Sequence, residues 1–177
     1  MESNPTKKLI YLSSLTAAGL SLFVFETLIP HPLPWVRLGL GNMAWLLALL
    51  LFGWKEAYLV TILKAILGTL ILGTFMTPTS LFALAGGIAA VTATGAVYRA
   101  APHLFSIVGL SVIGAVTHNI TQLLMAYGVL VRRPEIFAFT WTFILSGFVM
   151  GILTGSIAHL LLVRLESIVA GTEEFMV

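Results

Sequence analysis

The sequence contains neither cysteine nor aspartate among its 177 residues. Without cysteine the chain has no disulfide, no thiolate zinc site and no cysteine nucleophile. Without aspartate, the chain acting alone offers no aspartate-rich magnesium–diphosphate site and no aspartate-based catalytic triad. Charge is also scarce, at 9% of residues, against roughly 25% in soluble domains. This composition excludes an ordinary water-soluble enzyme.

Apolar residues, by contrast, make up 59% of the chain. They form repeated runs of about 20 residues, the length that crosses roughly 30 Å of hydrocarbon. Lipid does not tolerate unpaired backbone amides, and apolar runs without alternation are typical of helices rather than of a barrel. We therefore predict an all-α integral membrane protein in which residues 1–177 form one domain. The six predicted spans are 9–29, 38–53, 57–76, 81–97, 104–131 and 136–163.

The basic residues of the short loops predict the orientation of these spans. With the N-terminus inside, five Lys and Arg residues face the cytoplasm and three face outward. The first run is too long for a signal-peptide core and no A-x-A site follows it. We therefore expect a multi-pass protein of the plasma membrane with both termini in the cytoplasm.

A few polar side chains lie within the predicted spans, where an ionisable group costs at least ~2.5–3.5 kcal/mol. Glu26 lies in the outer part of the first span, and Asn42 opens the second span from the same side. The fifth span carries His118, Asn119 and Gln122, which share one arc of a helix that turns about 100° per residue. We expect these five side chains to converge on a cavity that opens away from the cytosol.

The alternative is that these amides bridge neighbouring helices, a contribution of about 1 kcal/mol each. Two further ionisable residues, Lys64 and His159, are interpreted as snorkelling toward the cytoplasmic interface. We do not expect Lys64 to pair with Glu26, because their estimated depths differ by more than about 10 Å at 1.5 Å per residue.

The loop between the first two spans is stiffened by three prolines within residues 30–34. It carries His31, Trp35 and Arg37 above the expected cavity, and residues 39–42 (Gly-Leu-Gly-Asn) permit close backbone approach. We interpret the loop as a lid or selectivity element; a plain connector is the alternative.

Small residues recur at four-residue spacing in two of the spans, which lets helices approach closely. Ser13, Ala17 and Ser21 form such a row in the first span, where it serves either internal packing or docking of a partner subunit. The glycine row from 147 to 155 in the sixth span predicts a packing ridge.

Several kinds of chemistry have no support in the sequence. No G-x-S-x-G, H-E-x-x-H or P-loop pattern occurs, and no basic patch favours nucleic acid. Glu26 with His118 supplies too few ligands to indicate a metal. We expect no catalytic residue, no metal and no cofactor in this chain, and we interpret the protein as a non-enzyme.

Three segments together resemble one known family. They are Arg-Leu-Gly-Leu-Gly-Asn at 37–42, Ala-Gly-Gly at 85–87, and Ser-Val-Ile-Gly-Ala-Val-Thr-His-Asn-Ile-Thr-Gln at 111–122. Over about residues 30–160 the chain resembles the Gx transporter family, also labelled heptaprenyl diphosphate synthase component I. That family is similar to the substrate-binding (S) components of energy-coupling-factor (ECF) transporters.

The resemblance implies a six-helix protein with cytoplasmic termini that binds a vitamin or precursor in an outer cavity closed by the first loop. It also implies a T component and two ATPases as partners, which would supply the ATP. The family docks the T component through an alanine row, and Ser13, Ala17 and Ser21 stand at those positions here. The family's association with isoprenoid and quinone genes suggests a quinone or prenyl precursor as cargo.

The leading interpretation is a transport subunit that captures a small anionic or aromatic molecule from outside. Arg37 and His31 would meet its charge, and Trp35 would cover it. The base of the site would be formed by Asn42, His118, Asn119 and Gln122, with Glu26 orienting a donor or a neighbour.

Two alternatives remain open at the level of sequence. One is an accessory or catalytic membrane component of isoprenoid or quinone synthesis, although no aspartate is present to hold magnesium against diphosphate. The other is a stand-alone proton-coupled carrier in which Glu26 and His118 handle the proton.

Overall fold

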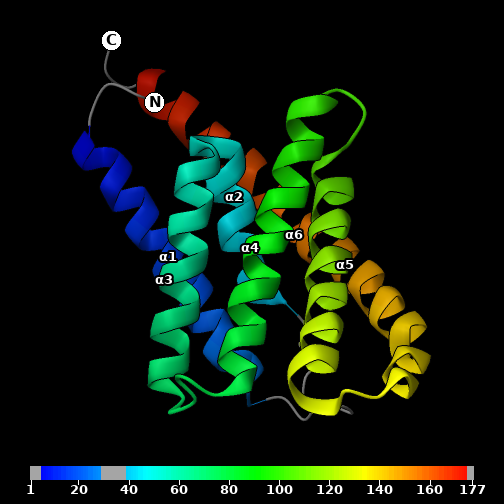
Figure 1. The fold of residues 1–177 in the computed structure, drawn as a ribbon. Helices are drawn as coiled ribbons and strands as arrows, with labels where there is room; N and C mark the ends of the chain where they lie inside the picture. The colour runs from blue at the N-terminus through cyan, green and yellow to red at the C-terminus, as the bar shows by residue number, and fades with distance from the viewer. Residues whose placement is uncertain (1–4, 29–38, 175–177) are drawn as a thin grey trace.

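The computed structural model describes residues 5–28 and 39–174, with side chains up to residue 164. The predicted loop contacts His31, Trp35 and Arg37 lie outside the described residues. The described part is helical and contains no strand, which confirms the predicted all-α class (Figure 1). Its α-helices are α1 (Pro5–Glu26), α2 (Met43–Phe52), α3 (Trp54–Ile71), α4 (Pro78–Ala100), α5 (Ile107–Ala126) and α6 (Thr140–Glu174).

The surface of the bundle is that of a multi-pass membrane protein. Large apolar side chains such as Leu145 and Trp141 are exposed along the helices. Four segments are long and apolar enough to cross a bilayer: 5–26, 78–100, 107–131 and 134–164. The beginning of α1 and the end of α6 lie at the same end of the bundle (Figure 1). Which end faces the cytoplasm stays a prediction.

The second predicted span, 38–53, corresponds to a short apolar helical segment, Leu40–Phe52. Helix α2 has 10 residues and rises about 15 Å, half of a bilayer core. A short 3-10 turn, η1 (Leu40–Asn42), precedes it and begins at Gly39 in the left-handed region, with φ +77°. The run from Met43 to Leu49 is buried on every side, which explains why α2 has no polar face. Residues 39–42 therefore lie near the middle of the bundle.

Helices α5 and α6 pack with very little space between them. A Cβ at Gly151 would lie 2.5 Å from Val112 Cα, and one at Gly147 would lie 2.9 Å from Val116 Cα. The Ser111 and Thr154 hydroxyls also form a hydrogen bond of 3.0 Å across this contact. The predicted packing role of the glycine row is confirmed.

The connection between α5 and α6 is less regular than the two long predicted spans. Helix α5 continues into a π-helical turn, η2 (Tyr127–Val131). Arg132 then adopts left-handed backbone with φ 48°. A 3-10 helix, η3 (Pro134–Phe139), leads into α6.

Helix α1 turns one face inward and its row of small residues outward. Gly19 and Phe23 are buried, and a Cβ at Gly19 would lie 2.5 Å from the Cβ of Ala44. Ser13, Ala17 and Ser21 are exposed. The row therefore does not pack within this bundle and is available to lipid or to another protein.

Candidate functional site

One end of the site lies where α1 meets the turn η1. The Glu26 side chain is only 1% exposed, and its carboxylate accepts a hydrogen bond from the backbone N–H of Leu40. A buried carboxylate is costly unless hydrogen-bonded or paired. Glu26 thus fastens the end of α1 to the turn that starts α2.

Lys64 lies in the same region, contrary to the prediction that it snorkels to the interface. It is 6% exposed. Its Nζ donates to Asn42 Oδ1 at 2.8 Å and to the Gly41 carbonyl at 3.2 Å. Lys64 and Glu26 line one small cavity and interact electrostatically. The large difference in depth that the sequence predicted for these two residues was therefore wrong.

The turn at Gly53 explains why Lys64 meets Asn42. Helices α2 and α3 run antiparallel from Gly53, whose φ of +104° permits the sharp reversal. Asn42 lies eleven residues before Gly53 and Lys64 eleven after it, so both reach the same height. Helix α1 also slants across the bundle (Figure 1), which brings Glu26 toward this level.

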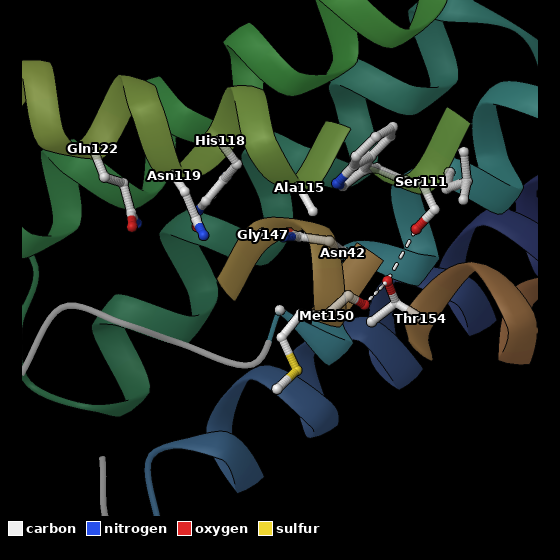
Figure 2. A pocket seen from close by; sticks show the side chains of 12 residues that line it. Asn42, Ser111, Ala115, His118, Asn119, Gln122, Gly147, Met150 and Thr154 are labelled. Atoms are coloured by element: carbon white, nitrogen blue, oxygen red, sulfur yellow. Dashed lines mark hydrogen bonds between the residues drawn. The ribbon is translucent and has the colours of Figure 1, made fainter. Parts of the chain in front are cut away.

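The polar face of α5 forms the opposite wall. Figure 2 shows His118, Asn119 and Gln122 projecting from α5 toward Asn42 and α6. Two small cavities, of about 30 and 20 Å³, share Asn42, His118 and Gln122 as lining residues. We call these two cavities together the polar crevice. Of the predicted site residues, the crevice brings together Glu26, Asn42, His118, Asn119 and Gln122.

The polar crevice in this conformation has room for a few water molecules at most. Pockets for drug-sized ligands measure about 300–1,000 Å³. A vitamin-sized molecule would therefore enter only if the helices or side chains around the crevice moved apart.

Asn119 and Gln122 differ in what their amides contact. Asn119 Nδ2 donates to the Phe143 carbonyl and to Ser146 Oγ, both at 3.0 Å. Asn119 therefore bridges α5 to α6, as the alternative interpretation proposed. Gln122 is 6% exposed, yet its amide forms no hydrogen bond within the residues that the structure describes. A buried amide left without a partner needs an explanation.

Trp45 is another donor at the crevice, and no sequence pattern pointed to it. It is 2% exposed and lines the larger cavity. Its Nε1–H has no hydrogen-bond partner in the described part of the chain. In an apolar run such as α2, a tryptophan is more often a core residue, so composition alone could not single it out.

Glycines on α4 and α5 make room for the two rings of the crevice. A Cβ at Gly86 would lie 2.9 Å from His118 Nδ1, and a Cβ at Gly114 would lie 2.7 Å from the Trp45 ring. No group of three or more potential His, Cys, Asp or Glu metal ligands occurs among the described residues. The crevice is lined instead by amide, hydroxyl and ring N–H groups.

A small all-helical membrane protein with a closed polar site between its helices is the class that these features define. The family model described as heptaprenyl diphosphate synthase component I matches residues 15–161. The chain belongs to this family, as its motifs predicted.

The fold has also been solved in another protein. The S component of a bacterial ECF transporter is 22% identical and superposes with a TM-score of 0.69, covering 94% of this chain and 99% of the other. This likeness shows that the two share a fold. No curated protein matches the sequence significantly.

Proposed function

We propose that the chain is the substrate-binding membrane subunit of an ECF-type uptake transporter for a small organic molecule, and not an enzyme. The observation that carries this proposal is that two donors, the Gln122 amide and the Trp45 indole N–H, line one crevice and form no hydrogen bond within the described residues. An arriving acceptor group would satisfy both donors. The fold shared with an ECF S component supports the same assignment.

Each crevice residue would have a separate role in binding the cargo. Gln122 and the Trp45 indole donate to acceptor atoms of the cargo, and the Lys64 ammonium adds a positive charge close by. Asn42 holds Lys64 in place through its hydrogen bond. His118 contributes a ring nitrogen, and Glu26 keeps the turn at Leu40 in position.

Uptake against a gradient needs an energy source, and the sequence has no P-loop. The proposal therefore includes a T component and ATPase subunits as partners. Ser13, Ala17 and Ser21 would dock the T component, since they form an exposed row of small residues on α1 that permits close helix approach.

The test is to identify what the purified full chain retains. Small molecules released on denaturation are identified by mass spectrometry, for the wild type and for Gln122→Ala. Asn119→Ala serves as the matched control, because it removes an amide that already has partners in α6. We expect Gln122→Ala to reduce the retained compound at least about tenfold, the loss of one to two hydrogen bonds. Equal retention in both variants would contradict the proposal.

The family description favours a second candidate, an accessory role in heptaprenyl diphosphate synthesis. Prenyl diphosphate chemistry needs carboxylates that hold magnesium, and the chain has no aspartate. Its role could then only be to assist a soluble synthase. Stimulation of such a synthase by the purified chain, with magnesium present, would favour this candidate over transport.

A further inference from the structure

A third and larger cavity, of about 390 Å³, lies between α4, α5 and the start of α6. We call it the apolar cavity. Phe82 of α4, Leu123 and Ala126 of α5 and Phe143 of α6 form much of its wall. Its volume falls within the range of pockets that hold small organic ligands. The volume of the polar crevice is below that range.

The apolar cavity and the polar crevice are neighbours. On α5, Gln122 lines the crevice and Leu123 the cavity; on α4, Ala83 lines the crevice and Phe82 the cavity. Gln122 and Ala126 are also one turn apart on the same face of α5, about 6 Å along its axis. The two spaces share no lining residue, but their walls adjoin on α4 and α5.

The apolar cavity lies away from the main buried cluster around α2. The main buried cluster surrounds α2, whereas the second contains only Leu123, Ile136 and Phe143. The apolar cavity is open on one side, where Leu130 and Phe139 of its wall are 56% and 46% exposed.

One wall of the cavity is the least regular part of the described chain. It is formed by the π-turn η2 and the 3-10 helix η3, joined at Arg132 in left-handed backbone. Such backbone is uncommon for a residue other than glycine and concentrates at ligand sites, as do π-helical turns. The wall also carries Arg133 and Glu135, of opposite charge.

We infer that the cargo is amphipathic: a small head with hydrogen-bond acceptors binds in the polar crevice, and an apolar body of ring size fills the apolar cavity. This inference rests on the proposed transport function. The crevice accepts only a small polar group, and the cavity supplies the apolar burial that gives affinity. A lipid acyl chain is the other occupant that the cavity could take.

The experiment uses the full chain in nanodiscs and two pairs of probes. 2-Naphthoate is compared with acetate, and 2-naphthamide with acetamide, so that each pair shares a head and differs in its apolar body. Equilibrium dialysis measures binding. For at least one pair we expect the naphthyl probe to bind at least about tenfold more tightly, as burial of a ring predicts after the costs of association.

Two variants reduce the cavity from opposite sides. Ala126→Phe adds a ring from α5, and Phe82→Trp enlarges the ring on α4. Leu124→Phe is the matched control, because Leu124 is 53% exposed on the outside of α5. We expect both cavity variants to abolish the naphthyl advantage and the control to keep it, with size-exclusion profiles confirming that each variant is folded.

The outcomes separate this inference from the proposed function. Naphthyl binding weakened by Gln122→Ala but not by either cavity variant would overturn the inference and leave the transport site in place. Binding that depends on Ala126 but not on Gln122 would mean a separate apolar site, as for a lipid chain, and would also overturn it. The inference would also be overturned if neither naphthyl probe bound more tightly than its short partner.

Discussion

Two helix contacts in this bundle are built in opposite ways. Helices α5 and α6 meet through glycines and a pair of hydroxyls, Ser111 and Thr154, without charge. Helices α1 and α3 meet around the turn η1, where Glu26 and Lys64 are buried. The first contact is a close-packed scaffold. The second holds charges at a depth where they are costly.

Stability alone does not account for the charged contact. Replacing a buried ion pair with well-packed apolar residues is often neutral or stabilising, whereas removing one partner is strongly destabilising. The presence of Glu26 and Lys64 is therefore best explained by what they hold: the turn at residues 39–42 and the crevice beside it.

The largest effect is expected from breaking the charged contact on one side. Lys64→Met leaves the Glu26 carboxylate buried without its compensating charge, and should cost about 3–5 kcal/mol of unfolding free energy. Thermal unfolding in detergent measures it. The Glu26→Gln, Lys64→Met double variant should recover much of the loss; a single variant as stable as the wild type would remove the distinction between the two contacts.

The scaffold contact should respond to size rather than to charge. Gly151→Ala places a methyl group 2.5 Å from Val112 Cα, and overpacking of this kind costs about 1–3 kcal/mol. Gly128→Ala is the control, because nothing lies within 4 Å of the added Cβ. If the two variants unfold at the same temperature, α5 and α6 are not held together by close approach.

A smaller change in stability should distinguish an amide that bridges two helices, Asn119, from one that is proposed to bind the cargo, Gln122. Asn119→Ala removes the hydrogen bonds to Phe143 and Ser146 and should cost about 1 kcal/mol. Gln122→Ala removes no hydrogen bond within the described chain, so it should cost less stability than Asn119→Ala. The unfolding free energies of the two variants are measured together. A larger loss in Gln122→Ala than in Asn119→Ala would mean that Gln122 is the structural amide.

The smallest change in stability is expected on the outside of α1. Ala17 is exposed, so Ala17→Leu should alter unfolding by less than about 0.5 kcal/mol. It should nevertheless reduce co-purification with a T component by blocking close helix approach. Val149→Leu, at a side chain 49% exposed on α6, is the control. Full co-purification of Ala17→Leu would exclude the row as the docking surface.

Much of the scaffold could be predicted from sequence because periodicity reports it directly. The three polar residues of α5 share a face by their spacing, and the glycines of α6 form a ridge by theirs. Helix number followed from apolar run length. None of these inferences needed to know how the helices tilt.

The errors share one cause, which is that an apolar run does not reveal where the backbone turns. Asn42 was placed at the outer end of the second span, whereas the structure places it beside Lys64 of α3. The equal spacing of Asn42 and Lys64 from Gly53 was the available signal. Trp45 had no such signal, because its unpartnered indole N–H is a property of the packed bundle.

Binding of the retained compound to the purified full chain tests the central claim most directly. If the crevice is the cargo site, the His118→Ala, Gln122→Ala double variant should bind that compound at least about 100-fold more weakly, as two lost hydrogen bonds predict. Saturable binding with unchanged affinity in the double variant would contradict the account.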